Sequence, residues 1–194
     1  MGKLEIGSWQ QNCPGQDVCG DRYFIQEDEN TLTVAIIDGL GHGPKAAQAA
    51  DKAVAAMENT NMSLSEVIPE AHRQLLGTRG AVLSIARIDY CSGNIKYIGI
   101  GNIYTYIVDQ NSVHRLISAE GFLGYRLPRF HEYSLEWGKT KQIIMFSDGI
   151  SAIPGRELLK MGWRNAADIA RIIGEKWGVN NDDKTVLVVK EKED

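Results

Sequence analysis

Cysteine is scarce in this 194-residue chain, which contains only Cys13, Cys19 and Cys91. No two of them form a CxxC pair, so a structural zinc site, which usually draws on such pairs, is not expected. An odd and sparse set also argues against the disulfide frameworks of small secreted proteins. The cysteine content therefore suits a reducing compartment and predicts a cytoplasmic protein.

Long apolar runs and an excess of positive charge are absent as well. The longest apolar runs are short, as at residues 34–37, whereas a membrane-spanning helix needs about 20 apolar residues. The N-terminus, MGKLEIGSWQ, has no apolar core of signal-peptide length. Lysine and arginine number 21 against 25 aspartates and glutamates, which gives a net charge of −4. We therefore expect neither a membrane nor nucleic acid as the main partner.

The composition that remains is typical of a folded domain, with 43% hydrophobic and 24% charged residues. A prior of about 150 residues per domain predicts that residues 1–194 form a single domain without a separate sensor. A chain of this length buries about 70% of its unfolded surface, so it needs neither a disulfide nor a metal ion to fold.

Short alternating or β-branched segments predict strands, many of them paired across polar turns. Three pairs are expected to form hairpins: 79–89 with 95–100, 104–108 with 113–117, and 133–137 with 142–146 through Gly138. The other strands are expected at residues 4–9, 21–26, 31–37 and 185–189.

Helices are expected in two blocks that stand apart from the hairpins. Pro44 opens an alanine-rich helix that continues to residue 59. Ser63 and Glu66 form a capping box for a second helix, which Gly77 ends. A further helical region is expected at about residues 156–177. This order favours an α+β fold with two mainly antiparallel sheets and helices packed outside them.

Aspartates recur at the ends of the predicted strands. Asp38 and Asp148 each follow an apolar strand and precede a glycine, Asp21 opens a strand, and Asp182 or Asp183 precedes the last strand. Carboxylates that converge at one sheet edge repel each other unless a cation neutralises them. All-oxygen ligands suit Mg²⁺ or Mn²⁺, and two such ions can activate water and hold a phosphoryl oxygen.

Each of these acids taken alone also has a simpler interpretation. An isolated Asp-Gly pair is usually a turn, and Asp28 and Asp89 are interpreted as turn acids. The Asp182–Asp183 pair is equally compatible with a plain loop before an edge strand. The full set in this order is more specific than any of its members.

The set resembles the metal-dependent serine/threonine phosphatases of the PP2C superfamily. The resemblance rests on GD at 20–21, DGLGHG at 38–43, SDG at 147–149 and DDKT at 182–185. It is closest to the bacterial branch that includes the sporulation and stress-response phosphatases. Two further segments of this chain, GIGN (99–102) and GFLGYR (121–126), resemble glycine-bearing segments of that branch. The resemblance covers nearly the whole chain and implies a PP2C-like α-β-β-α sandwich.

The resemblance also implies a site with two Mn²⁺ or Mg²⁺ ions between the sheets. In that site Asp38 bridges both ions, the Gly39 carbonyl and Asp21 bind one of them, and Asp148 and Asp182 bind the other. Asp38 and Asp148 would then be the central catalytic residues.

The choice of Asp182 over Asp183 follows the family pattern, in which the ligand stands three residues before a hydroxyl residue, here Thr185. The implied substrates are phosphoserine and phosphothreonine on small regulatory proteins, namely phosphorylated stressosome or anti-sigma-antagonist proteins.

The sequence departs from the eukaryotic members at two points. Leu40 and Gly41 separate Asp38-Gly39 from His42, whereas the eukaryotic members place histidine directly after Asp-Gly. We therefore interpret His42 as packing at the start of the helix rather than as a general acid. No arginine matches the phosphate-binding arginine of the eukaryotic members. Three arginines remain candidates, although a solvated or sheet-stabilising role is favoured for each: Arg22, Arg79 and Arg126.

Three functions are consistent with these features. The first is a metal-dependent phosphatase, monomeric and without attached regulation, that acts in negative feedback on stress-response proteins. The second is a catalytically weak pseudophosphatase that binds phosphoproteins as a regulatory module. The third is a structural domain stabilised by Ca²⁺ or Mg²⁺. The clustered acids favour the first, because a binding surface has no need for carboxylates that repel each other.

Overall fold

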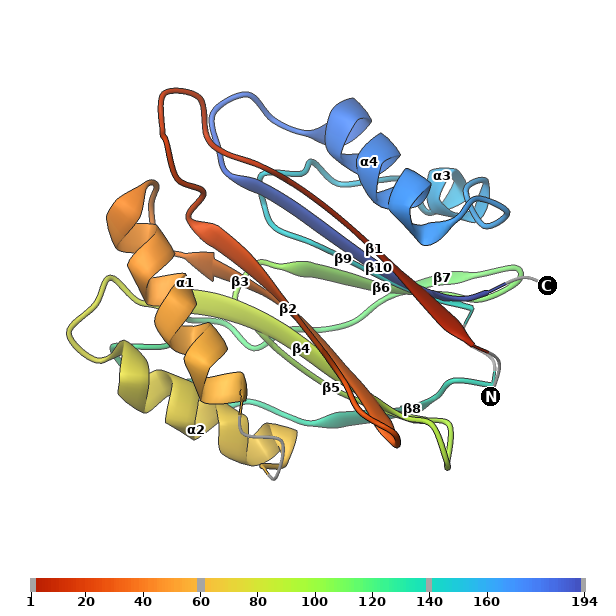
Figure 1. The fold of residues 1–194 in the computed structure, drawn as a ribbon, viewed down its shortest axis with the longest axis horizontal. Coiled ribbons are helices and arrows are strands. Elements are labelled where there is room, and N and C mark those ends of the chain that lie inside the picture. The colour runs from red at the N-terminus through yellow and green to blue at the C-terminus, as the bar shows by residue number, and fades with distance from the viewer. Residues whose placement is uncertain (1–2, 59–61, 139–140, 193–194) are drawn as a thin grey trace.

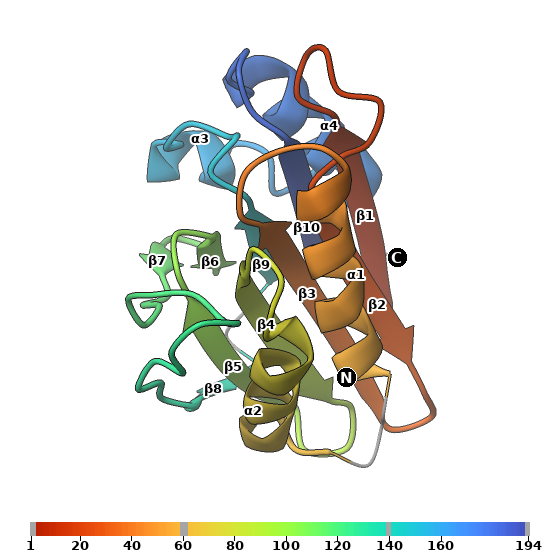
Figure 2. The ribbon, with the colours of Figure 1, turned by 90° about the vertical axis from the view of Figure 1, so that its left-hand side faces the viewer.

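The computed structural model describes residues 3–58, 62–138 and 141–192. Two antiparallel five-stranded sheets pack face to face, and helices cover the outer face of each sheet (Figures 1 and 2). This is the α+β fold that the residue pattern predicted and the α-β-β-α sandwich that the resemblance to the PP2C superfamily implied. Within the described residues, no helix is long and apolar enough to cross a membrane.

The first sheet has the strand order β2-β3-β4-β5-β8. Strand β3 lies inside it, and its apolar side chains alternate between two cores: Val34 and Ile36 face the other sheet, and Ala35 and Ile37 face the helices. The strands are β2 (Asp21–Glu27), β3 (Thr31–Gly39), β4 (Ala81–Asp89), β5 (Asn94–Ile100) and β8 (Tyr133–Glu136).

The second sheet has the strand order β1-β10-β9-β6-β7. Its central strand β9 is buried along its whole length, as expected for a strand covered on both faces. The strands are β1 (Leu4–Gln11), β6 (Tyr104–Val108), β7 (Val113–Arg115), β9 (Gln142–Phe146) and β10 (Lys184–Glu191).

In the described part of the chain, four helices form the outer layers, with α1 (Pro44–Met57) and α2 (Leu64–Leu75) on the first sheet and α3 (Gly155–Leu159) and α4 (Ala166–Trp177) on the second. Helix α1 packs closely because its buried face is mainly alanine. The capping box of Ser63 and Glu66 is present at the start of α2, as predicted. The single helical region expected at residues 156–177 is two helices, separated by residues 160–165.

The expected hairpin of residues 133–137 with 142–146 is wrong. Strand β8 pairs with β5 in the first sheet, whereas β9 lies between β6 and β10 in the second. Burial explains the difference. Strand β8 alternates between partly buried and exposed residues, which suits the edge of a sheet. Every residue of β9 is buried, which suits a strand inside a sheet that is covered on both faces. The other two predicted hairpins are confirmed.

Candidate metal centre

Strand pairing brings the predicted acids to one end of the two sheets. Asp21 and Asp38 are direct partners in the register of β2 and β3. In the second sheet, Phe146 near the end of β9 pairs with Val186 near the start of β10, so Asp148 and the Asp182–Asp183 segment lie at the same end. The ends of these strands meet at the left of Figure 1.

The acids are close enough to raise the pKa of Asp38 and of Asp148. Burial, followed by the charges of Asp21, Asp148, Asp182 and Asp183, raises the pKa of Asp38 to about 9. The pKa of Asp148 is raised by burial and by Asp182, although a hydrogen bond with Asp38 opposes that rise. The cluster is therefore costly to ionise without a neutralising partner.

Asp21 lies deepest, with only 1% of its surface exposed. Burial raises its pKa to about 7, and hydrogen bonds with Ser147 and Thr185 partly oppose that rise. Its Oδ2 atom is buried and has no hydrogen-bond partner. A buried carboxylate oxygen without a donor is unusual, because such atoms are nearly always paired. The orphaned oxygen, among carboxylates and hydroxyl groups that offer only oxygen donors, fits a hard divalent cation such as Mg²⁺ or Mn²⁺.

The two adjacent acids before β10 have different surroundings. Asp183 is buried, and its Oδ1 and Oδ2 atoms accept backbone N–H bonds from Cys13 at 2.8 Å and Gly20 at 2.9 Å. It thereby ties the segment before β2 to the start of β10. Asp182 has a third of its side chain exposed (33%), and no backbone donor from another segment binds it in the described structure. These contacts favour Asp182 as the acid that can bind an ion.

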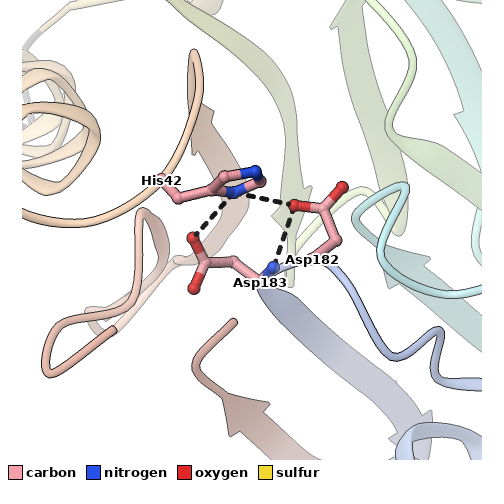
Figure 3. A group of neighbouring side chains, drawn as sticks. All are labelled: His42, Asp182 and Asp183. Atoms are coloured by element: carbon pink, nitrogen blue, oxygen red, sulfur yellow. Dashed lines mark hydrogen bonds and ion pairs between the residues drawn. The ribbon is translucent and has the colours of Figure 1, made fainter. Parts of the chain in front are cut away.

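His42 contacts both of these acids (Figure 3). Its Nδ1 atom lies 3.2 Å from Asp182 Oδ1 and 3.8 Å from Asp183 Oδ2, and its side chain is 43% exposed. The three side chains can bring ligand atoms within 4.8 Å of one another. The structure thus differs from the expectation that His42 simply packs at the start of α1, because the glycine-rich turn carries the ring to the acids.

Gly39 and Gly149 permit a close approach of backbones at this site. A Cβ atom at Gly39 would overlap the carbonyl of Ala46 in α1, and one at Gly149 would overlap the carbonyl of Asp183. Neither glycine has a positive φ, so space rather than backbone conformation requires glycine here. The Asp-Gly pairs therefore bring Asp38 against α1 and Asp148 against the segment before β10.

Asn102 lies in the GIGN segment, and its contact with the acids was not predicted from the sequence. Its Nδ2 atom donates a 2.6 Å hydrogen bond to Oδ2 of Asp148. Of the candidate arginines, Arg22 binds Asp51 of α1 at 2.6 Å and backbone carbonyls beside Asp21. Arg22 thus has the structural role favoured for it, and Asn102 fixes one oxygen of a candidate ligand.

We expect Asn102→Ala to weaken divalent-ion binding and activity by about 10- to 100-fold, since groups that orient metal ligands usually have effects of that size. The measurement is Mn²⁺ titration by calorimetry together with the metal dependence of turnover. Asn111→Ala, in the exposed turn after β6, is the matched control. Unchanged ion affinity in the Asn102 variant would show that this hydrogen bond does not orient Asp148.

Comparisons with known proteins identify the family of this chain. The sequence model of Stage II sporulation protein E (SpoIIE) matches residues 28–191. The chain belongs to the SpoIIE family. Phosphoserine phosphatase RsbX of Bacillus subtilis (strain 168) is 26% identical over 157 residues, which are 79% of this SpoIIE-family chain and 78% of RsbX.

Two solved structures are similar over almost the full SpoIIE-family chain. One comes from work on the bacterial stressosome as a modular system adapted to control secondary messenger signalling. It has a TM-score of 0.89 and 34% identity, and covers 97% of this chain and 100% of that one. The other is RsbX in complex with magnesium, with a TM-score of 0.84, 21% identity, and 99% and 100% coverage. The chain is accordingly a serine phosphatase of the SpoIIE and PP2C type.

Proposed function

We propose that this phosphatase removes phosphate from phosphoserine or phosphothreonine on small stress-response proteins, with Mg²⁺ or Mn²⁺ as cofactor. The observation that carries the proposal is the cluster of Asp21, Asp38, Asp148 and Asp182, in which burial and mutual repulsion raise the pKa of Asp38 to about 9. In this proposal residues 1–194 act as one cytoplasmic, monomeric phosphatase domain.

Five residues would hold the ions: Asp21, Asp38, the carbonyl of Gly39, Asp148 and Asp182. Divalent ions bound by oxygen donors neutralise phosphoryl charge and activate water for an in-line attack on phosphorus. Asp38 has the central position, because its titration responds to the charge of each of the other acids.

Neighbouring groups hold these carboxylates in place. Asn102 donates to Asp148 at 2.6 Å, and Ser147 and Thr185 stabilise the charged form of Asp21. His42 Nδ1 lies 3.2 Å from Asp182 Oδ1, so the imidazole can restrain that carboxylate. Fixed ligands of this kind reduce the reorganisation needed when substrate binds.

The substrate class is supported by the relatives. RsbX is named a phosphoserine phosphatase, and the chain of 34% identity comes from work on the stressosome. We propose that the substrates are phosphorylated stressosome or anti-sigma-antagonist proteins and that dephosphorylation resets them in negative feedback. A pseudophosphatase would retain this strained acidic cluster without using it, and no contact in the described residues favours that alternative.

The test is phosphate release from a serine-phosphorylated stressosome protein and from a serine-phosphorylated anti-sigma antagonist. We expect release with Mn²⁺ or Mg²⁺ and none with EDTA. Folded, metal-loaded protein that binds the phosphoprotein but releases no phosphate would contradict the proposal and favour a phosphoprotein-binding module. Equal release with and without EDTA would contradict the role of the ions.

A further inference from the structure

The arginines of this chain divide into two groups according to their contacts. Three exposed arginines, Arg79, Arg126 and Arg129, make no hydrogen bond, ion pair or ring contact with any described residue. The other seven each have a carboxylate, carbonyl, hydroxyl or aromatic partner: Arg22, Arg73, Arg87, Arg115, Arg156, Arg164 and Arg171.

The unpaired arginines come from two segments that pack against each other. Ala81 and Leu123 exchange backbone hydrogen bonds of 3.1 and 2.8 Å, and the backbone N–H of Gly124 donates to His72 Nδ1 at 3.2 Å. A Cβ atom at Gly124 would lie 3.0 Å from the Cα atom of Gly80. The loop that carries Arg79 thus lies directly beside the segment that carries the other two.

The same loop also borders the turn that follows Asp38. Gly39 pairs with Ala81, and the N–H of Leu40 donates to the carbonyl of Gly80 at 3.0 Å. The Arg79 side chain reaches the same turn, because a Cβ atom at Gly41 would lie 2.7 Å from Arg79 Nη1. Since consecutive Cα atoms are about 3.8 Å apart, Gly41 lies within about 11 Å of Asp38.

A hollow of about 520 Å³ adjoins this loop, since Phe122 in its lining would lie 2.8 Å from a Cβ atom at Gly80. Arg126 and Arg129 line it with Tyr125, whose side chain is 82% exposed, and with Leu127. Glu120 is the one carboxylate among the lining residues. The surface therefore combines unpaired positive charge with apolar contact area in a chain whose net charge is −4.

We propose that Arg79, Arg126 and Arg129 form a docking surface for an acidic segment next to the phosphorylated residue of the protein substrate. This inference rests on the proposed function and names the substrate feature that the surface recognises. Unpaired guanidinium groups bind carboxylates through paired N–H donors. The place of Arg79 beside the Asp38 turn puts its contacts on the side of the acidic cluster, and Arg126, Arg129 and the exposed Tyr125 extend the surface along the hollow.

The experiment compares two phosphoserine peptides that differ only in flanking residues, one with Asp and Glu and the other with Asn and Gln. The variant replaces Arg79, Arg126 and Arg129 with serine. Exposed ion pairs each change an equilibrium by a factor of about 1.5 to 5, so we expect KM for the acidic peptide to rise about tenfold. We expect little change for the neutral peptide or for p-nitrophenyl phosphate, and loss of the acidic preference at high salt.

The matched control replaces three exposed arginines that already bind carboxylates, Arg73, Arg156 and Arg171, and so removes the same total charge. An equal rise of KM in this control would overturn the proposal in favour of general electrostatic steering. An unchanged KM for the acidic peptide in the first variant would also overturn it. If both variants still hydrolyse p-nitrophenyl phosphate with metal, the proposed phosphatase activity is intact. A negative result with the acidic peptide then counts against the docking surface alone.

Discussion

Asp38→Asn is expected to abolish metal-dependent phosphate release while the protein stays folded. Asp38 is the paired neighbour of Asp21, and the charges of Asp21 and Asp148 both raise its pKa. One substitution therefore alters the centre of the cluster. Loss of several kcal/mol of charge stabilisation in the transition state corresponds to a fall of about a thousandfold or more. The measurement is kcat on a phosphoserine protein, with calorimetric titration of Mn²⁺ to show the accompanying loss of ion binding.

Glu29→Gln is the control for this experiment, because it removes one carboxylate charge from the exposed turn after β2. It should leave turnover and ion affinity unchanged. Circular dichroism must show the same fold for both variants. Turnover of the Asp38 variant close to that of the unmodified protein would remove Asp38 from the mechanism and with it the proposed arrangement of ligands.

The second large effect is expected in the stability of the metal-free protein. Asp38 has an ordinary pKa of 3.8 when unfolded and about 9 when folded, and the pKa of Asp21 is raised to about 7. Between these values the folded state holds protons that the unfolded state has released. Raising the pH therefore favours unfolding. In EDTA we expect Tm to fall steadily from about pH 5 to about pH 9.

Divalent ions should reverse much of this fall, since they bind the ionised cluster of the folded state only. In EDTA near pH 8, Asp38→Asn should melt at a higher temperature than the unmodified protein, because it lacks the acid that is most costly to ionise. Glu29→Gln should follow the unmodified protein at each pH. A metal-free Tm that rises with pH in this range would contradict the account of the cluster.

Local chemistry in the sequence was sufficient to predict most of the elements. The alanine-rich stretch after Pro44 forms α1, and Ser63 with Glu66 caps α2. Asp28 and Asp89 accept backbone N–H bonds within their own turns, as interpreted. These features depend on residues a few positions apart, so propensity and turn chemistry determine them.

The sequence also determined the order of the acids and the kind of ion that suits them, because carboxylates at strand ends are visible in the chain itself. Only the tertiary structure decided to which sheet β8 and β9 belong, because the sequence of a strand does not show which other strands pair with it. It likewise decided that Asp183 binds backbone amides, that His42 contacts Asp182, and that Asn102 holds Asp148. Those contacts join residues up to 170 positions apart, and only the packing of the two sheets brings such distant residues within hydrogen-bonding distance.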